Sequence, residues 1–210
     1  MKNITAAVAG ATGLVGGFVL RRLLNDPEIA RVVAPTRRSL APHPKLDNPT
    51  LRGGAWPVLP PLDEAYGCLG TTRKAAGSDA AFRAVDLDLA FSFARAAKAA
   101  GARRFGLVSS IGADSRSRFL YPRTKGEAET AVSGLGFESV VIVRPSLLVG
   151  ERAEPRPGEA LAVAAFRAVE PLLIGPLRRW RAVRAEDVAA SLVSALRGRV
   201  PGVLVLESGK

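Results

Sequence analysis

The sequence has few of the residues that build disulfides and transition-metal sites. Its 210 residues include one cysteine, Cys68, and one histidine, His43. A single cysteine excludes an intramolecular disulfide and is typical of a protein kept in a reducing compartment, so the sequence predicts a cytoplasmic location. Zinc sites need several His or Cys ligands, and we therefore expect no metal.

A long apolar run is also absent. No continuous apolar stretch reaches the length of about 18 residues that a membrane-spanning helix needs, so we expect no membrane span. Hydrophobic residues nevertheless make up 48% of the chain and charged residues 23%, which is typical of a globular protein. The length is sufficient for one sizeable domain, residues 1–210, and no linker indicates a second one.

Acidic residues are in the minority. The 30 Lys and Arg residues exceed the 19 Asp and Glu residues, and the formal net charge is +11. Such a charge can indicate nucleic-acid binding, but the basic residues are spread along the chain in pairs such as Arg21-Arg22 and Arg103-Arg104. No dense basic run with interleaved aromatic residues occurs, so we expect no nucleic-acid partner. An Arg-rich surface that attracts an anionic cofactor is the simpler interpretation.

The most informative stretch is the glycine-rich segment Gly10-Ala11-Thr12-Gly13-Leu14-Val15-Gly16. It follows the apolar run Ile4–Ala9, which predicts a buried strand, and it opens the run Leu14–Leu24, whose apolar residues recur at helical spacing. A strand, three glycines at this spacing and a helix are typical of a dinucleotide-binding turn, in which the backbone approaches a pyrophosphate at the helix N-terminus. A signal peptide is the alternative, but the glycines interrupt its apolar core and no clean cleavage site follows.

The residues after the second predicted strand, Arg31–Ala34, bear on the choice of cofactor. Thr36-Arg37-Arg38 lies about 20 residues after Gly16, where the adenosine ribose of a dinucleotide is bound. An acidic residue there favours NAD, whereas the guanidinium groups of Arg37 and Arg38 suit a 2′-phosphate and favour NADP(H). The alternative is that the two arginines belong to a solvated turn in a basic protein.

Strands and helices alternate along the rest of the chain. The proline-rich residues 41–62 predict no regular helix, only a short strand near residues 50–52 and an extended loop. The alternation predicts an α/β fold, a Rossmann-like doubly wound parallel sheet with a small C-terminal substrate-side extension. Residues 1–150 would form the NAD(P)-binding core and residues 151–210 the extension. Further strands are expected at 64–69, 105–109, 140–143 and 203–206, and helices at 79–100, 122–132, 158–169 and 185–196.

A Tyr-x-x-x-Lys pair lies on the helix that follows the strand end Ser109-Ser110. Tyr121 and Lys125 are four residues apart, so they share one helical face. Reduction of a carbonyl by a nicotinamide needs an acid, and a free Tyr, with a pKa of about 10, needs a nearby ammonium group to act as one. Lys125 can provide that charge and bind the nicotinamide ribose, while Ser110, or alternatively Ser109, orients the substrate oxygen. The alternative is a Tyr and a Lys that merely flank a helix start.

These motifs resemble the short-chain dehydrogenase/reductase superfamily. The blocks at 68–78, 109–114, 121–127 and 144–159 are similar to its atypical, Tat-interacting-oxidoreductase-like branch and the bacterial relatives of that branch. The resemblance implies a Rossmann domain, NADP(H), a small carbonyl or alcohol substrate, and catalytic roles for Ser110, Tyr121 and Lys125. It also implies cofactor contacts from Thr12, Gly13, Leu14, Val15, Arg37, Leu69, Gly70, Thr71, Pro145, Ser146 and Leu147. With Gly10, Gly16, Arg38, Ser109, Tyr121 and Lys125, these are the expected cofactor-binding residues.

Two departures from the family pattern keep other functions open. The proline-rich region is shorter than the family's strand–helix unit, and Asp86 stands near the position where many relatives place the Asn of a proton relay. An NADP(H)-binding regulatory or interaction protein with little or no turnover is therefore the alternative to an oxidoreductase. An isomerase or epimerase is disfavoured, because the chain after Gly150 is short for a nucleotide-sugar lobe. The oligomeric state is left open.

Overall fold

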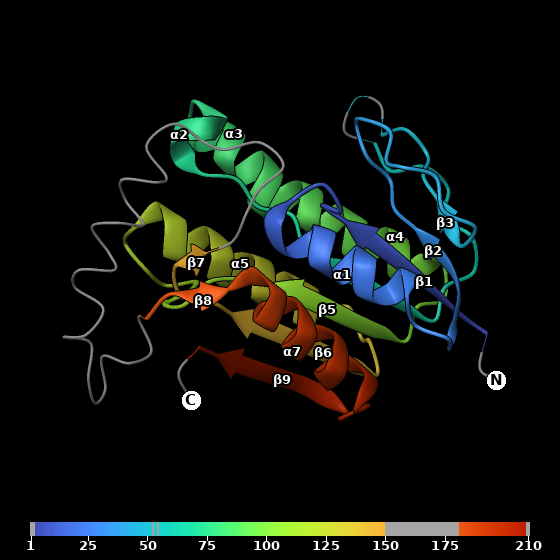
Figure 1. The fold of residues 1–210 in the computed structure, drawn as a ribbon. Helices are drawn as coiled ribbons and strands as arrows, with labels where there is room; N and C mark the ends of the chain where they lie inside the picture. The colour runs from blue at the N-terminus through green and yellow to red at the C-terminus, as the bar shows by residue number, and fades with distance from the viewer. Residues whose placement is uncertain (1–2, 52, 54, 150–180, 209–210) are drawn as a thin grey trace.

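A seven-stranded parallel sheet runs through the protein (Figure 1). The computed structural model describes residues 3–51, 53, 55–149 and 181–208. The strand order is β3-β2-β1-β4-β5-β6-β9, and every neighbouring pair is parallel. The strands are β1 (Ile4–Ala9), β2 (Ile29–Val33), β3 (Leu46–Asp47), β4 (Glu64–Gly67), β5 (Arg104–Val108), β6 (Ser139–Arg144) and β9 (Gly202–Glu207).

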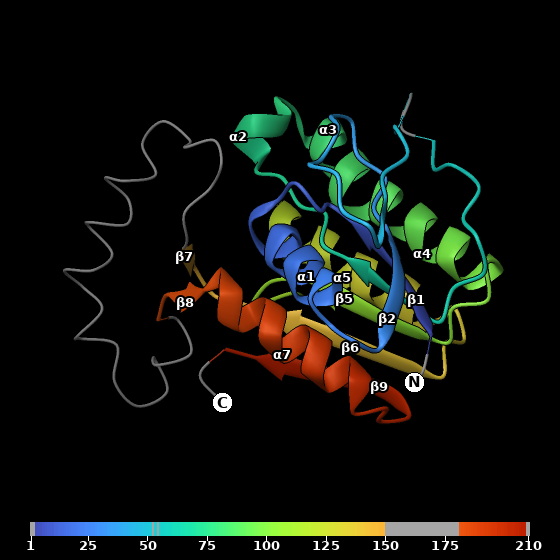
Figure 2. The same ribbon diagram turned by 45° about the vertical axis from the view of Figure 1, so that its right-hand side comes forward.

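Helices cover both faces of this sheet, which confirms the predicted doubly wound α/β fold (Figures 1 and 2). On one face lie α1 (Leu14–Leu24) and α7 (Ala185–Arg197), whose apolar residues form one core with β1 and β6. On the other lie α3 (Asp79–Arg83), the π-helical turn η1 (Ala84–Leu89), α4 (Ala90–Ala99) and α5 (Leu120–Ser133), which run beside a second core. Strands buried on both faces are expected to be largely apolar, as β1 is from Ala6 to Ala9 and β6 from Val140 to Val143.

The proline-rich region forms an edge strand in place of the usual crossover helix. The short strand predicted near residues 50–52 is wrong in position, because β3 pairs Leu46 with Val32 and Asp47 with Val33. Farther on, only an isolated bridge joins Thr50 to Thr36. Prolines are tolerated at a sheet edge because their missing N–H groups interrupt fewer ladder hydrogen bonds.

Other differences from the predicted elements are small. The short helix α2 (Arg73–Ala76) was not predicted; Thr72 caps it by accepting a hydrogen bond from the N–H of Ala75 at 3.1 Å. Helix α5 begins at Leu120, so Pro122 is its third residue and not its first. A separate pair of short strands, β7 (Leu148–Val149) and β8 (Val183–Arg184), lies near the carboxyl edge of the main sheet. The helix predicted at 158–169 and the boundary at 150/151 lie outside the described residues.

Within the described ranges, every helix is too short or too polar to cross a membrane.

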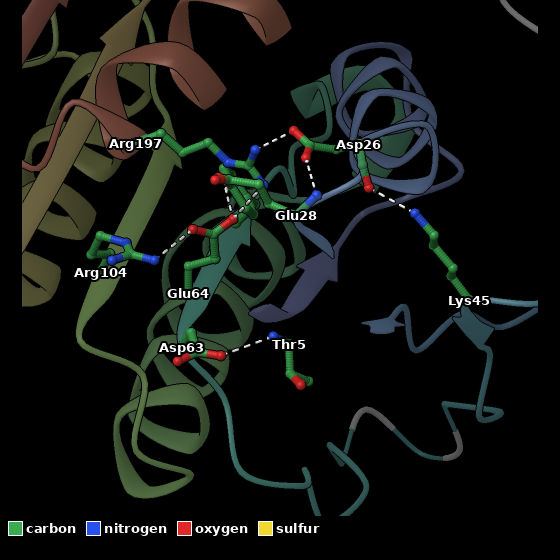
Figure 3. A network of polar contacts seen from close by, with 9 residues as sticks. Thr5, Asp26, Glu28, Lys45, Asp63, Glu64, Arg104 and Arg197 are labelled. Carbon is green, nitrogen blue, oxygen red and sulfur yellow. Dashed lines mark hydrogen bonds and ion pairs between the residues drawn. The ribbon is translucent and has the colours of Figure 1, made fainter. Parts of the chain in front are cut away.

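A network of largely buried charged side chains lies at the amino edge of the sheet, opposite the carboxyl edge that β7 and β8 lie near (Figure 3). Glu64, the first residue of β4, is fully buried and accepts hydrogen bonds from Arg104 at 3.0 Å and from the Tyr66 hydroxyl at 2.9 Å. Arg197, the last residue of α7, lies 3.5 Å from Glu64 and also pairs with Asp26, which follows α1. Burial, and then the charge of Glu64, raise the pKa of Tyr66 well above its usual value, so its hydroxyl stays protonated and donates. The network therefore ties α7 and the α1–β2 turn to the sheet.

Candidate active site

The glycine-rich segment, called the glycine turn below, lies at the carboxyl end of β1. In the sheet β1 pairs with β2 on one side and with β4 on the other, so the strand order reverses at this point. Open α/β sheets bind ligands at such a switch point. Gly10 has a φ of 81°, and the N–H of Gly13 donates to its carbonyl oxygen at 2.8 Å. A Cβ on Gly10 would lie 2.5 Å from the carbonyl oxygen of Cys68, and one on Gly16 would lie 2.1 Å from that of Gly10. The turn is therefore accessible only to glycine at these two positions.

The start of α1 has the features of an anion site. Gly13 is its N-cap and provides no side-chain hydrogen bond, and no acidic residue lies in the first turn. The N–H groups of a first helical turn have no intrahelical partner and carry the positive end of the helix dipole. Thr12 and Gly13 are exposed, whereas Val15 and Gly16 are buried. The residues present thus fit a dinucleotide pyrophosphate, with Val15 and Gly16 supporting the turn from inside.

An alanine at Gly16 is expected to disrupt this turn. Its Cβ would meet a backbone oxygen that cannot rotate away, so we expect a loss of about 1–3 kcal/mol in the free energy of unfolding and at least tenfold weaker dinucleotide binding. Thermal unfolding and a fluorescence titration with NADPH measure the two effects.

Gly17→Ala is the matched control for this substitution. Its Cβ would make an ordinary 3.5 Å contact with the Ala11 carbonyl oxygen, and alanine favours a helix by about 1 kcal/mol over glycine. A Gly16→Ala variant that behaves like Gly17→Ala would contradict the described turn.

Cys68, the residue that follows β4, packs against the turn. This residue is partly buried, and its Cβ lies 3.1 Å from the position of a Cβ on Gly16. Burial raises the pKa of its thiol to about 12. The thiol therefore stays protonated near neutral pH, and we assign it a packing role only.

The Tyr121–Lys125 pair lies on the first turns of α5. Tyr121 is 45% exposed, and its ring stacks on the buried ring of Phe82 with centroids 5.6 Å apart. Lys125 is buried one turn later. A Cβ on Gly126 would lie 2.2 Å from the backbone nitrogen of Ser115, so glycine is needed for α5 to pack closely on that loop. The packing fixes the helix that carries both candidate catalytic residues.

Lys125 makes a buried ion pair that the sequence did not predict. Its Nζ lies 2.6 Å from Oδ1 of Asp86, whose side chain has no exposed surface. The other Asp86 oxygen, Oδ2, accepts a hydrogen bond from the N–H of Thr71 at 2.8 Å. Asp86 lies in η1, and single π-turns of this kind are frequent at functional sites. A signal was available, because Asp86 shares the apolar helix face of Phe82, and an acid on such a face needs a partner.

Asp86 therefore joins three parts of the candidate site. It connects η1 to Lys125 on α5 and to the backbone of Thr71, which follows β4. Gly70 lies next to the Lys125–Asp86 ion pair, since a Cβ on Gly70 would be 3.7 Å from Lys125 Nζ. The expected cofactor residues Leu69, Gly70 and Thr71 are thus brought beside Lys125 by a residue that sequence reasoning treated only as a departure.

The two serines differ in accessibility. Both follow β5, but Ser109 is buried and its hydroxyl has no partner among the described residues, whereas Ser110 is only partly buried. The Ser110 hydroxyl donates weakly to the carbonyl oxygen of Ile111 at 3.3 Å. The geometry therefore favours Ser110 over Ser109 as the group that contacts a substrate.

Residues 145–147 lie next to the serine segment. The N–H of Ile111 donates to the carbonyl oxygen of Pro145 at 2.9 Å, which extends the β5–β6 pairing to this edge. Pro145 is buried, the Ser146 hydroxyl donates to the carbonyl oxygen of Arg181, and Leu147 is exposed. The glycine turn, Thr36–Arg38, Leu69–Thr71, the serines and residues 145–147 all follow parallel strands, so they share one edge of the sheet.

A second network, missed by sequence reasoning, anchors α5 to this edge. Arg144, at the end of β6, donates to both carboxylate oxygens of Glu129 at 2.6 and 2.9 Å and to Glu207 at 3.1 Å. The hydrogen bonds to Glu129 raise the pKa of Arg144 above its ordinary value despite desolvation, so it remains charged. Glu129 follows Lys125 by one helical turn, and the bidentate pair holds that face of α5 on the sheet.

Comparisons with known proteins find relatives over most of the chain. The Fmp52 protein of Aspergillus clavatus is 39% identical over 216 residues, which cover 96% of this chain and 91% of that protein. The HTATIP2 protein of Rattus norvegicus is 37% identical over 171 residues, which cover 77% of this chain and 70% of that protein. The chain belongs to the family of the Fmp52 and HTATIP2 proteins. No model of a protein family matches it.

Solved structures share the fold of this Fmp52/HTATIP2 family member. MoeE5 in complex with UDP-glucuronic acid and NAD aligns with a TM-score of 0.75 over 98% of this chain and 76% of that chain, at 19% identity. A short chain dehydrogenase family protein from Francisella tularensis aligns with a TM-score of 0.68 over 99% and 98%, at 11% identity. At these identities the likeness shows the fold alone, which is a Rossmann-like α/β fold.

The relatives correct two expectations about the Fmp52/HTATIP2 family member. They come from fungi and rat and do not support the narrower expectation of a bacterial subgroup. The Fmp52 proteins of Emericella nidulans and Aspergillus clavatus are named mitochondrial, which contradicts the predicted cytoplasmic location. A single cysteine indicates a reducing compartment but does not distinguish one such compartment from another, and the prediction was wrong for that reason.

Proposed function

We propose that this protein is an NADP(H)-dependent oxidoreductase that interconverts a small carbonyl compound and its alcohol. The observation that carries the proposal is that Tyr121 and Lys125 lie four residues apart on α5, and so share one helical face, in the helix that follows Ser110 and the end of β5. The glycine turn at the switch point of the same sheet edge supports a dinucleotide there.

Each residue has a distinct role in this reaction. The bound dinucleotide supplies the hydride or accepts it. The Tyr121 hydroxyl donates a proton to the carbonyl oxygen during reduction and accepts it back during oxidation. The Ser110 hydroxyl donates a hydrogen bond to the same oxygen, and the Lys125 ammonium stabilises the negative charge that develops on Tyr121. Phe82 holds the tyrosine ring, and Asp86 holds the lysine.

One observation favours a second function, an NADP(H)-binding regulatory or interaction protein with little turnover. The carboxylate of Asp86 lies 2.6 Å from Lys125 Nζ in a buried environment and offsets part of the charge that Tyr121 needs. A screen of aldehydes and ketones for NADPH oxidation distinguishes the two functions. Turnover of any of them above the rate without protein supports the oxidoreductase, and tight NADPH binding without turnover supports the second function.

NADPH is expected to bind more tightly than NADH. The exposed Arg37 and Arg38 follow β2 at the adenosine side of the site, and one charge-assisted hydrogen bond to a 2′-phosphate contributes about 1.5–3 kcal/mol. The preference should therefore be about tenfold or more. Fluorescence titration with each cofactor measures it. Equal affinities, or a preference that survives Arg37→Glu, would contradict the NADP(H) assignment.

A further inference from the structure

The pairing of the proline-rich edge strand with β2 contains a gap that one side chain fills. Residues 32, 33 and 36 pair with residues 46, 47 and 50 in a single parallel register. In this register the carbonyl oxygen of Ala34 faces the backbone nitrogen of Pro49, which has no hydrogen to donate. The side-chain Nδ2 of Asn48 donates to this oxygen instead, at 2.5 Å. Asn48 thus replaces the missing ladder hydrogen bond.

The same side chain closes the turn that carries Arg37 and Arg38. Asn48 Nδ2 also donates to the hydroxyl of Thr36 at 2.7 Å, and Asn48 Oδ1 accepts from the N–H of Leu40 at 2.8 Å. The Thr36 hydroxyl in turn donates to the carbonyl oxygen of Arg38 at 2.6 Å. Both ends of the four-residue turn 37–40 are therefore held by side-chain hydrogen bonds that start from Asn48.

Packing fixes this turn further. Thr36 is buried, and Leu40 is partly buried against the core on the α1 face of the sheet. The side chains of Arg37 and Arg38, by contrast, are exposed. The hydrogen bonds of Asn48 and Thr36 and the packing of Leu40 thus order the backbone of the turn that presents the two arginines.

We infer that Asn48 is a positioning residue for cofactor choice, which holds the Arg37–Arg38 turn in the conformation that binds a 2′-phosphate. The inference rests on the proposed function. A turn that is ordered before the ligand arrives loses less conformational entropy on binding, and the affinity for the phosphate rises by that amount. NADH, which has no 2′-phosphate, does not gain from this ordering.

The test is the affinity of Asn48→Ala for NADPH, NADH and 2′,5′-ADP, each measured by titration. We expect NADPH and 2′,5′-ADP to bind about tenfold more weakly than they bind the wild type, because at least one hydrogen bond and the turn's order are lost. NADH should bind within about twofold of the wild type, since a twofold change corresponds to a small fraction of one hydrogen bond. A purely structural role would weaken all ligands together, and that result would overturn the inference.

Three further variants keep the test decisive. Asp47→Asn is the matched control on β3, because it removes only the exposed ion pair with Arg31 and should leave every affinity unchanged. Thr36→Val removes the hydroxyl that links Asn48 to Arg38 and should reproduce the loss of NADPH affinity, while Thr36→Ser should retain it. If Asn48→Ala does not fold, Thr36→Val provides the same measurement.

The outcomes separate this inference from the proposed function. Equal binding of NADPH and NADH by the wild-type protein contradicts the NADP(H) assignment and the inference together. A wild-type preference for NADPH that persists in Asn48→Ala and in Thr36→Val contradicts only the role of Asn48. Loss of the preference in both variants, with folding retained, supports both.

Discussion

Tyr121→Phe is expected to lower kcat by about 10²–10⁴ while leaving the dissociation constant of NADPH nearly unchanged. The substitution removes only the hydroxyl, and a positioned acid of this kind contributes about that factor to the rate. The phenyl ring that remains still stacks on Phe82, so α5 should keep its position and the cofactor its contacts. Steady-state kinetics with a substrate found in the carbonyl screen, beside an NADPH titration, measures the two quantities.

The other tyrosine in the chain provides a matched control. Tyr66→Phe removes a buried hydroxyl that donates to Glu64 at the opposite edge of the sheet, so it should lower stability and leave kcat unchanged. Lys125→Ala should weaken NADPH binding and turnover together, because its ammonium serves both. A Tyr121→Phe variant that turns over substrate at the wild-type rate would show that Tyr121 has a structural role and that another group supplies the proton.

Glu64→Ala is expected to give the largest loss of stability that we predict, about 3–5 kcal/mol in the free energy of unfolding. Removing one partner of a buried ion pair leaves the other charge uncompensated. Here the loss of Glu64 leaves the Arg104 guanidinium and the Tyr66 hydroxyl without their acceptor, and Arg197 loses one of its two carboxylate partners. For a chain of this size each kcal/mol corresponds to about 2–4 °C, so Tm should fall by roughly 6–20 °C.

A surface ion pair provides the comparison for Glu64. Arg31→Ala breaks the exposed contact with Asp47 and should change the free energy of unfolding by less than about 1 kcal/mol. NADPH affinity of folded Glu64→Ala should equal that of the wild type, because the network lies at the amino edge of the sheet and the glycine turn at the carboxyl edge. A loss below about 1 kcal/mol for Glu64→Ala would show that water satisfies the network's charges.

The order of the elements was predictable because it depends on local patterns. The strand Ile4–Ala9 and the helix Leu14–Leu24 have the predicted bounds, since a short apolar run and an apolar stripe at helical spacing each specify their own conformation. Alternation of such segments predicts a parallel sheet, and that fold class is confirmed. The roles of Tyr121, Lys125 and Ser110 stay predictions.

The edge strand was placed wrongly because its position depends on a neighbour distant in sequence. Prolines in residues 41–62 excluded a helix, as predicted, but they did not reveal which residues pair with β2. The register that pairs Leu46 with Val32 leaves Pro49 opposite Ala34, and it is acceptable because the Asn48 side chain supplies the missing hydrogen bond. Neither the secondary-structure propensities of the residues nor the spacing of apolar residues along the chain contains that information.

By itself, the sequence determined a Rossmann-like fold with a glycine turn after the first strand, because spacing along the chain encodes turns, strands and helices. Only the tertiary structure decided the partners of the buried charges: Asp86 for Lys125, Glu129 for Arg144, and Glu64 for Arg104 and Arg197. These pairs join residues from different elements, and burial makes a charged group depend on whichever opposite charge the fold brings within reach. Such proximity depends on how the elements pack in three dimensions, and no repeating pattern in the sequence indicates it.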